Sequence, residues 1–256
     1  MTSTDALPAL ARLQRERDAA RAELQEFTAS VSHDLRAPLR HINAFAQIIE
    51  EDLLDMPAEI AAHLATIRQS AQLLTQQLDG LTALSRLAQH TVHLTAVDSA
   101  ALVRSVVDEL RLQHRDRELQ WQIPADLPTV TADADWLRQV LRQVLDNACK
   151  FTRSRHPAQI SLTWAALADR RVCLMAQDNG VGFRTGQASQ LFKAFVRLHP
   201  AREFDGLGLG LVQCRKMLAR MGGDISITAT PDAGCQVRIS LAADGQNGQG
   251  PAPVSG

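Results

Sequence analysis

The feature that most constrains this chain is a repeat of apolar residues spaced three and four positions apart, which extends from Leu10 to Ala88. This spacing is typical of helices that pack against other helices along an apolar seam, as in a coiled coil. Pro57 interrupts the repeat, because proline disfavours helical conformation in the residue before it. We therefore expect one long helix from about Leu7 to Leu54. Its apolar positions are Leu10, Leu13, Ala20, Leu24, Phe27, Val31, Leu35, Leu39, Ile42, Phe45, Ile49 and Leu53, and only Arg17 breaks the alternation.

A second long helix is expected after Pro57, since the same alternation resumes there. Its positions are Ile60, Leu64, Ile67, Ala71, Leu74, Leu78, Leu81, Ser85 and Ala88. The turn between the two helices is so short that they must lie antiparallel. A single helical hairpin hides little of two apolar stripes, so we expect two hairpins to pair into a four-helix bundle. This predicts a homodimer.

Beyond Leu94 the pattern changes to short elements of both kinds, which predicts an α/β sandwich. The expected helices are one capped by Asp98, one from Asp135 to Thr152, and one from Leu209 to Met221 that ends at Gly222 and Gly223. The expected strands are Leu119–Ile123, Thr129–Ala132, Gln159–Ala165, Arg171–Ala176, Asp224–Thr230 and Cys235–Leu241. The predicted organisation is a coiled-coil helix (1–28), a helical dimerisation domain (29–92), an α/β domain (93–242) and a disordered tail (243–256).

Composition narrows the possible partners and surroundings. The 256 residues carry a net charge of −1, so no basic field indicates nucleic acid binding. Charges or glutamines interrupt every apolar stretch before it reaches the roughly 18 residues of a membrane span, and we expect a soluble, cytoplasmic chain. The four cysteines lie far apart and form no Cys-x-x-Cys pair, so we expect them to be reduced and mostly buried.

One histidine of the first helix has the surroundings of a nucleophile. His33 lies two residues after Val31 and two before Leu35, so at about 100° per residue it points away from the seam toward solvent. Asp34 next to it can orient one ring nitrogen and take its proton while the other nitrogen attacks. A lone surface histidine is more often merely solvated, and the helical phase does not single out His33 by itself.

The run SHDLRAPLR, from Ser32 to Arg40, closely resembles the phosphoacceptor box of sensor histidine kinases, especially of their phytochrome-like branch. Proline inside a helix costs about 3 kcal/mol and kinks it, and in that family the kink corresponding to Pro38 lies next to the phosphoacceptor. The resemblance implies that His33 is the phosphoacceptor. It also implies that Asp34 is the general base.

Three further positions of this box refine the expectation. The resemblance implies that Arg36 and Arg40 are exposed cations near the phosphoryl group or the partner, with a solvated helix face as the alternative. Related kinases that also dephosphorylate their partner usually carry Thr or Asn four residues after the histidine, where it positions a hydrolytic water. This chain has Ala37 there, which offers no hydrogen-bonding side chain. We therefore expect weak phosphatase activity toward the partner.

Three stretches of the α/β domain have the chemistry of a nucleotide site. The stretch Gly206–Gly210 opens a helix and places bare backbone amides where phosphates bind. Asn147 and Lys150 share a helix face and offer an oxygen for magnesium and a positive charge for phosphate. Asp178 follows a strand and can accept a hydrogen bond from an exocyclic amine such as that of adenine.

Together with Leu191–Arg197, these stretches look like the ordered boxes of the histidine-kinase ATP-binding domain. That family shares its fold with type II topoisomerase, mismatch-repair and chaperone ATPases. The resemblance covers roughly Ala29 to Leu241. It implies ATP and Mg²⁺ as ligands, with Asn147 on magnesium, Lys150 on phosphate and Asp178 on adenine. The glycines implied around the base and the phosphates are Gly180, Gly182, Gly206, Gly208 and Gly210.

The same resemblance implies a mobile ATP lid over Arg184–Asp205, and Phe192, Phe195 and Arg197 are its candidate functional residues. The two phenylalanines would dock the lid against the core of the domain. Phenylalanines at this spacing are also ordinary core residues, and the sequence leaves both interpretations open.

Two positions depart from the family pattern. Gln143 stands where the family often has an asparagine, one turn before the magnesium ligand, and Leu207 replaces a frequent small or hydroxyl residue. Both favour an alternative in which the chain is a dimeric scaffold that binds ATP only as a structural ligand. A third reading is an ATP-hydrolysing clamp of the topoisomerase or chaperone type, which the pair of His33 and Asp34 argues against.

The preferred hypothesis is that the chain phosphorylates its own His33 from ATP and passes the phosphoryl group to an aspartate of a response-regulator receiver domain. The input is expected from an upstream sensory region or from a partner protein. Whether the phosphoryl group is transferred within one subunit or between the two depends on the handedness of the turn at Asp55–Pro57, and the sequence leaves this open. Two metal-like pairs, His90 with His93 and Asp133 with Asp135, lie at element ends and are interpreted as hinge and cap residues.

Overall fold

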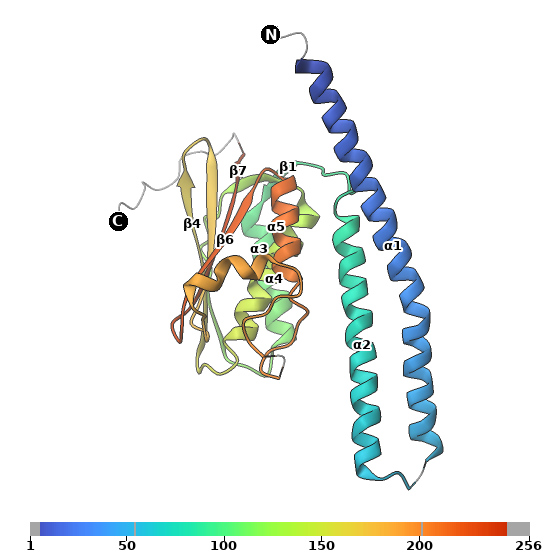
Figure 1. The fold of residues 1–256 in the computed structure, drawn as a ribbon. Helices are drawn as coiled ribbons and strands as arrows, with labels where there is room; N and C mark the ends of the chain where they lie inside the picture. The colour runs from blue at the N-terminus through green and yellow to red at the C-terminus, as the bar shows by residue number, and fades with distance from the viewer. Residues whose placement is uncertain (1–5, 54, 201, 245–256) are drawn as a thin grey trace. The chain divides into compact units, whose positions relative to one another are not determined.

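The computed structural model describes residues 6–53, 55–200 and 202–244 (Figure 1). The chain divides into two compact units, Met1–His90 and Thr91–Gly256. The predicted domain boundary, between residues 92 and 93, lies two residues further along. The tail predicted for 243–256 falls outside the described residues from position 245 onward, and Ala243 is the last residue of a strand.

The first unit is an antiparallel pair of helices, α1 (Ala6–Asp52) and α2 (Ala58–Arg86). Helix α1 continues through Pro38. Pro57 occupies the N-cap position of α2, which agrees with the break expected from the sequence. Side chains join the two helices through Arg36 with Asp79 at 2.9 Å and through Glu50 with Arg68. Gln25 of α1 also bonds Gln89, just after the end of α2, at 2.9 Å.

The hairpin buries a narrower set of residues than the seam predicted from the sequence. On α1 the buried side chains are Ser32, Leu39 and Ala46, which are seven residues apart. On α2, Leu64 and Ala71 continue the same spacing. Of the α2 repeat, these two residues are therefore covered within the hairpin. On α1, however, the predicted apolar positions do not face α2, except for Leu39.

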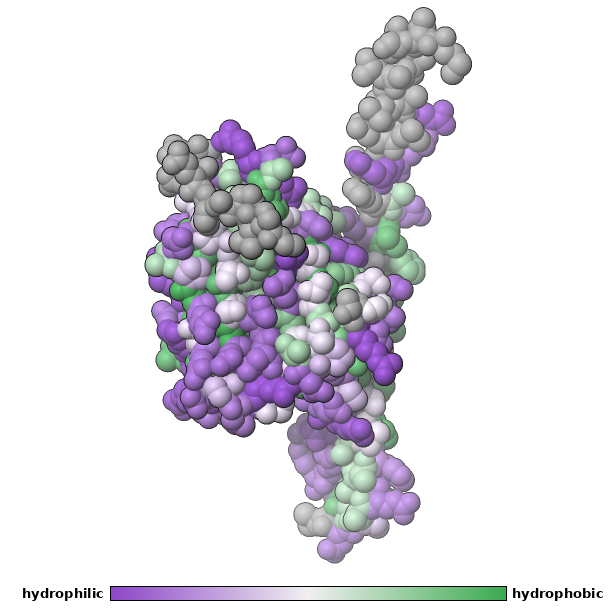
Figure 2. Space-filling view, turned by 90° about the vertical axis from the view of Figure 1, so that its left-hand side faces the viewer, coloured by the Kyte–Doolittle hydropathy of each residue, from purple (hydrophilic) through white to green (hydrophobic). Residues whose placement is uncertain are grey.

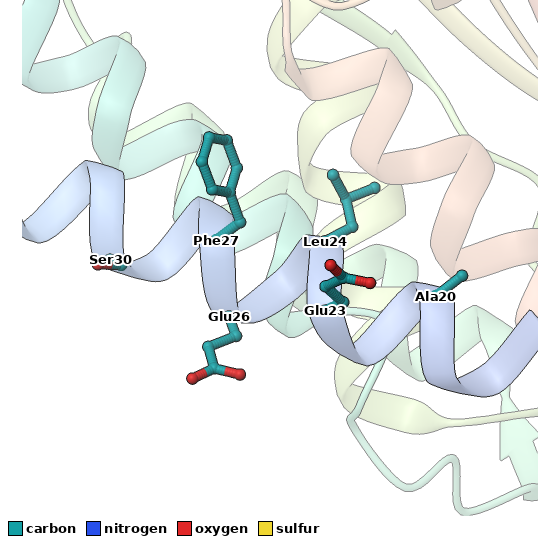
Figure 3. A pocket seen from close by; sticks show the side chains of 6 residues that line it. All are labelled: Ala20, Glu23, Leu24, Glu26, Phe27 and Ser30. Atoms are coloured by element: carbon teal, nitrogen blue, oxygen red, sulfur yellow. The ribbon is translucent and has the colours of Figure 1, made fainter.

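The rest of the repeat forms an uncovered apolar seam, each side chain of which is between 36% and 65% exposed in the single chain. Its residues are Leu24, Phe27, Val31, Leu35, Ile42, Phe45, Ile49 and Leu53 on α1, and Ile60, Ile67, Leu74 and Leu81 on α2. Figure 2 shows green apolar areas among the polar surface of the hairpin. Figure 3 shows Leu24 and Phe27 projecting from one side of α1 and Glu26 from the other. The side chains of Leu10 and Leu13, also predicted for this seam, lie outside the described set.

The second unit is built on a seven-stranded sheet with the order β1-β3-β7-β5-β4-β2, in which β6 also pairs with β7. All pairings are antiparallel except β2 with β4. The strands are β1 (Thr95–Asp98), β2 (Leu119–Gln122), β3 (Thr129–Ala132), β4 (Ala158–Leu167), β5 (Arg171–Asp178), β6 (Asp224–Thr230) and β7 (Gly234–Ala243). The sequence predicted all of them except β1.

Helices α3 (Ser99–Gln113), α4 (Ala134–Phe151) and α5 (Gly210–Arg220) cover one face of this sheet (Figure 1). Asp98 caps α3 by accepting a hydrogen bond from the Ala101 amide at 2.9 Å. Asp133 caps α4 in the same way, with the Trp136 amide at 3.2 Å. The predictions of both caps are confirmed. No helix among the described residues combines the length and apolarity needed to cross a membrane.

The core of this unit lies between the helices and the sheet. Its largest fully buried side chains are Leu110, Leu137, Leu141, Leu145, Ile160, Leu162, Leu174, Leu218, Ile239 and Leu241. Three cysteines are buried and Cys235 is partly buried. The α/β architecture expected from the alternating pattern is therefore confirmed, and it closes its core without a second copy.

Candidate functional site

His33 projects from the solvent-exposed face of α1. Its side chain is 84% exposed, and its Nδ1 lies 3.2 Å from Oδ1 of Asp34, which is itself exposed. A carboxylate oxygen can only accept a hydrogen bond, so this contact places the ring hydrogen on Nδ1. The other ring nitrogen, Nε2, then carries the free lone pair. The arrangement makes the imidazole a nucleophile with a proton acceptor beside it.

The surroundings of His33 differ from expectation at Arg36. Instead of standing free, Arg36 donates from Nε at 3.2 Å and from Nη2 at 2.9 Å to the same oxygen of Asp79 on α2. Arg40 is exposed, as expected. A groove next to the ion pair is lined by Arg36, Asp79, Thr82, Ala83, Arg86, Leu87 and His90. Ala37 is half-buried and offers no polar atom to this surface.

The end of α4 carries the predicted magnesium and phosphate residues. The Oδ1 atom of Asn147 accepts a hydrogen bond from Nε2 of Gln143 at 3.3 Å. Lys150 donates to the backbone carbonyl of Asp205 at 3.0 Å, and its Nζ lies 4.5 Å from the centre of the Phe151 ring. Burial lowers the pKa of Lys150, and the charge of Asp146 acts in the opposite direction.

Asp178 is the last residue of β5 and only 8% of it is exposed. Its Oδ1 accepts a hydrogen bond from the amide of Gly180 at 2.8 Å. Burial raises the pKa of this carboxyl to about 6, although the hydrogen bonds from the amides of Gly180 and Cys235 favour the charged form. An acceptor held in such a low-polarity setting forms a strong bond with a donor that reaches it.

Two of the predicted glycines have a geometric requirement for glycine. Gly182 has φ of +59°, and a Cβ there would lie 2.0 Å from the carbonyl oxygen of Thr230. Gly208 has φ of +72°, and a Cβ there would lie 2.6 Å from the carbonyl oxygen of Val196. Both sites therefore combine a left-handed backbone with close approach of another chain segment. A side chain at either position would collide with the backbone of the neighbouring segment.

Short contacts place the predicted nucleotide residues in one region of the α/β unit. The amide of Val181 donates to the carbonyl of Phe151, which directly follows Lys150. A Cβ on Gly206 would lie 3.6 Å from Nζ of Lys150, and one on Gly210 would meet the side chain of Gln143. The ends of α4 and β5 and the start of α5 thus converge.

The segment predicted as the lid begins with a short 3-10 helix, η1 (Thr185–Phe192). Phe192 is buried, its carbonyl accepts a hydrogen bond from Arg215 at 2.9 Å, and the Arg215 guanidinium lies over its ring. Phe195 is 39% exposed and has φ of +64°, so the docking predicted for it is not found. The Phe195 backbone instead donates to the carbonyl of Gly208 at 3.1 Å. Arg197 donates to the carbonyl of Phe204.

Several residues at this site were missed by the sequence analysis. Phe151, His199 and Phe204 form an aromatic cluster, and Nε2 of His199 lies 3.0 Å from the carbonyl oxygen of Gly182. Arg155 donates from Nη2 to the carbonyls of Gly180 and Asp232 at 3.2 and 2.9 Å. Phe151 could have been found by its position after Lys150. His199 and Phe204 lie in an irregular stretch where no periodic pattern marks them.

Comparison with known families and proteins matches two stretches of the chain, one in each unit. Residues 23–90 match the His Kinase A (phospho-acceptor) domain, and residues 132–245 match the histidine kinase-, DNA gyrase B- and HSP90-like ATPase family. The adaptive-response sensory kinase SasA of Thermosynechococcus vestitus is 29% identical over 245 residues, which covers 91% of this chain and 64% of the relative. The phytochrome-like protein Cph1 of Synechocystis sp. is 26% identical over 235 residues, covering 91% of this chain and 31% of the relative.

A third relative and a solved structure follow the same pattern. The sensor protein kinase WalK of Staphylococcus haemolyticus is 25% identical over 223 residues, covering 86% of this chain and 36% of the relative. The crystal structure of full-length ShkA in complex with AMPPNP superposes with a TM-score of 0.60 at 27% identity, covering 86% of this chain and 46% of ShkA. The chain thus spans less than two thirds of the length of each of these relatives. By its two domains and their order, the chain belongs to the sensor histidine kinases.

Proposed function

We propose that this chain transfers the γ-phosphoryl group of ATP to His33, and from His33 to an aspartate of a response-regulator receiver domain. The observation that carries the proposal is the contact between Nδ1 of His33 and Oδ1 of Asp34 on an exposed helix face. Membership of the histidine kinase family supports the same reaction. The acceptor and the nucleotide residues lie in separate compact units, so the reaction requires these units to meet.

The chemistry of the first step follows from the tautomer of His33. Nε2 attacks the γ-phosphorus, the bond between that phosphorus and the bridging oxygen breaks, and ADP leaves with the electron pair. The hydrogen on Nδ1 then passes to the carboxylate of Asp34. Phosphoryl transfer depends on alignment and charge stabilisation more than on covalent help. Asp34 therefore acts by orienting the ring and accepting its proton.

The proposed nucleotide-binding roles follow from the hydrogen-bond donors and acceptors of the site. The carboxylate of Asp178 would accept a hydrogen bond from the exocyclic amine of adenine. Lys150 would give up its hydrogen bond to the Asp205 carbonyl and donate to a phosphate oxygen instead. The bare backbone of Gly206, Gly208 and Gly210 would donate to the phosphates at the start of α5.

A magnesium ion fits the donor chemistry at Asn147. Its amide oxygen is the type of ligand that Mg²⁺ takes together with phosphate oxygens and waters. Among the described residues, no group of three or more His, Cys, Asp or Glu side chains could hold a metal ion, so Asn147 would hold it jointly with the nucleotide. When bound there, Mg²⁺ supplies neutralisation of phosphate charge.

We also propose that the acting form is a homodimer in which the apolar seams of two hairpins pack into a four-helix bundle. The seam residues repeat at the heptad spacing that such packing requires. A monomer would leave these twelve large side chains in water, which soluble proteins avoid for continuous patches.

A labelling experiment tests the proposed reaction. Incubation with γ-labelled ATP and Mg²⁺ should produce an acid-labile label in the unmodified protein and none in His33→Gln. His41→Ala, which changes another exposed histidine of α1, is the matched control and should retain the label. Asn147→Ala should lose both label and nucleotide affinity. A label that persists in His33→Gln would contradict the assignment.

The same assay separates the competing functions. A scaffold that binds ATP structurally would never become labelled, and an ATPase clamp would release phosphate without labelling the protein. Transfer to a partner is tested by adding purified receiver domains to the labelled protein. Loss of label from His33 with gain on a receiver aspartate is the expected result.

A further inference from the structure

A histidine of the predicted lid contacts the loop that follows β5 in the proposed nucleotide site. Nε2 of His199 lies 3.0 Å from the carbonyl oxygen of Gly182. A carbonyl oxygen only accepts hydrogen bonds, so Nε2 is the donor and carries the hydrogen. Gly182 belongs to the loop that starts at Asp178, the proposed adenine ligand. The bond therefore joins the lid directly to the base-binding loop.

The partner of this bond is held rigidly in place. The Val181 carbonyl accepts a hydrogen bond from the Asp232 amide at 2.8 Å, and the Val181 amide donates to the Phe151 carbonyl at 3.2 Å. Arg155 bridges the carbonyls of Gly180 and Asp232. A Cβ at position 182 would collide with the Thr230 carbonyl. These contacts fix the loop that receives the His199 bond.

The ring of His199 also packs into an aromatic cluster. Its centroid lies 5.6 Å from that of Phe151 and 5.3 Å, edge on, from that of Phe204, while Phe151 and Phe204 are 4.9 Å apart. These distances are those of favourable aromatic pairs. Phe204 is buried, and its carbonyl accepts a hydrogen bond from Arg197. The cluster thus joins two points of the lid to the residue that follows Lys150.

The next residue along the lid completes the connection to the phosphate side. Asp205 offers its carbonyl to Lys150 at 3.0 Å, and Gly206 begins the glycine-rich stretch. The contacts that hold His199 and Phe204 therefore also fix the start of the glycine-rich stretch. A lid without this anchor would have to be ordered by the nucleotide itself, and ordering backbone and side chains on binding weakens affinity.

We propose that His199 is a positioning residue for the nucleotide site: its hydrogen bond to Gly182 and its packing on Phe151 and Phe204 hold the lid in place for Mg-ATP before the nucleotide binds. This inference rests on the proposed ATP-binding function. His199 is assigned no part in the chemical step. It acts through the lid and through the start of the glycine-rich stretch.

Two measurements on the full chain test the proposal. In calorimetric titration with Mg-ADP, His199→Ala should bind about tenfold more weakly, which corresponds to about 1.4 kcal/mol. In the nucleotide-free protein, trypsin should cut after Lys193 and Arg202 several-fold faster in His199→Ala than in the unmodified chain. His199→Gln retains an N–H donor, and His199→Phe retains an aromatic ring, so each should recover part of both effects.

Gln190→Ala, an exposed position of the same lid, is the matched control and should change neither measurement. The proposal is overturned if His199→Ala leaves lid cleavage unchanged, or if it binds Mg-ADP as tightly as the unmodified chain or more tightly. Tighter binding would mean that the segment competes with the nucleotide. If the unmodified chain binds no Mg-ADP, the proposed ATP-binding function is contradicted as well. If the unmodified chain and His199→Ala bind Mg-ADP equally well, only the proposed role of His199 is contradicted. Thermal melting of each variant verifies that it is folded.

Discussion

The helical hairpin and the α/β unit solve the same problem, the burial of apolar residues, in different ways. In the α/β unit, side chains such as Leu141, Leu174 and Ile239 are at most 1% exposed within one chain. In the hairpin, the buried positions of α1 are Ser32, Leu39 and Ala46, and most of the large apolar residues remain on the outside. One unit completes its core by folding, and the other has its largest apolar surface left for another molecule.

This difference implies different roles for the two units. A closed core provides fixed positions for Asp178 and the glycines, as precise nucleotide binding requires. A hairpin that depends on association has its stability linked to its partner and therefore to concentration. His33, the proposed phosphoacceptor, lies on the unit whose apolar seam is exposed in the single chain.

The largest effect should follow from charging the seam. Ile67→Lys with Leu74→Lys places two lysines per chain where the proposed bundle has its core. Loss of four such apolar side chains per dimer removes about 6–12 kcal/mol of burial, so sedimentation equilibrium should give a monomer. Leu112→Lys is the matched control, because Leu112 is an apolar residue of the α/β unit that is 76% exposed. A double variant that remains a dimer would contradict the seam as the interface.

A core substitution in the α/β unit should act without regard to association. Leu174 is fully buried in β5, and Leu174→Ala should lower the free energy of unfolding by about 2–5 kcal/mol. Chemical denaturation of this variant should show the same loss at all protein concentrations. A loss that varies with concentration would mean that the closed core also depends on the dimer.

The buried carboxyl of Asp178 should give the α/β unit a pH-dependent stability. Its pKa is raised by burial to about 6, so the folded protein holds a proton that the unfolded chain has already released. Stability is then greatest below the unfolded pKa and is lost as pH rises through about 6. Relative to Asp178→Asn, the unmodified protein should lose up to roughly 3 kcal/mol between pH 4 and pH 7. Urea unfolding at both pH values measures this difference, and a constant difference would exclude it.

Asp178 should also make nucleotide affinity pH-dependent, with the opposite preference. Adenine needs an acceptor, so Mg-ADP should bind more weakly as pH falls below about 6. A fluorescence titration between pH 5 and pH 8 measures the effect. Asp178→Asn, which cannot ionise, should show a flatter profile and weaker binding at pH 8.

The smallest effect should come from the ion pair between Arg36 and Asp79. The pair is partly exposed to solvent, with side-chain exposures of 32% and 58%, and such pairs contribute at most about 1 kcal/mol. A double-mutant cycle of Arg36→Ala and Asp79→Ala, measured by thermal unfolding of the dimer, should give a coupling energy in that range. A coupling well above it would show that the hairpin is held by polar ties more than by its seam.

Sequence reasoning predicted the elements whose ends carry strong local signals. Asp98 and Asp133 start helices because their carboxylates satisfy free amides. Pro57 marks the break between α1 and α2, where it occupies the N-cap of α2. Strand β1 was missed because its four residues bury only Val97 and give no alternation. The heptad spacing alone also does not determine which apolar residues of the repeat pack against the other helix of the same chain.

Among the candidate site residues too, those with a local sequence signal could be proposed and those without one could not. Asn147, Lys150, Asp178 and the glycines could be proposed from the sequence because their chemistry suits a nucleotide and their stretches resemble the boxes of a known family. The contact of His199 with Gly182 joins residues 17 apart across an irregular segment, and it depends on a fold that local patterns do not encode. The exposure of Phe195 was mispredicted for a related reason. Its backbone is in the left-handed region, which turns its side chain away from the position a regular helix would give.

Helix α1 runs without interruption from Ala6 to Asp52 and carries His33 well inside it. Each residue of an α-helix turns the chain by about 100°. The direction in which His33 faces is therefore tied, as an angle, to the direction of every side chain earlier in the same helix. A small twist applied near the beginning of α1 would turn the phosphoacceptor by the same angle, and one inserted residue would turn it by more than a quarter of a revolution.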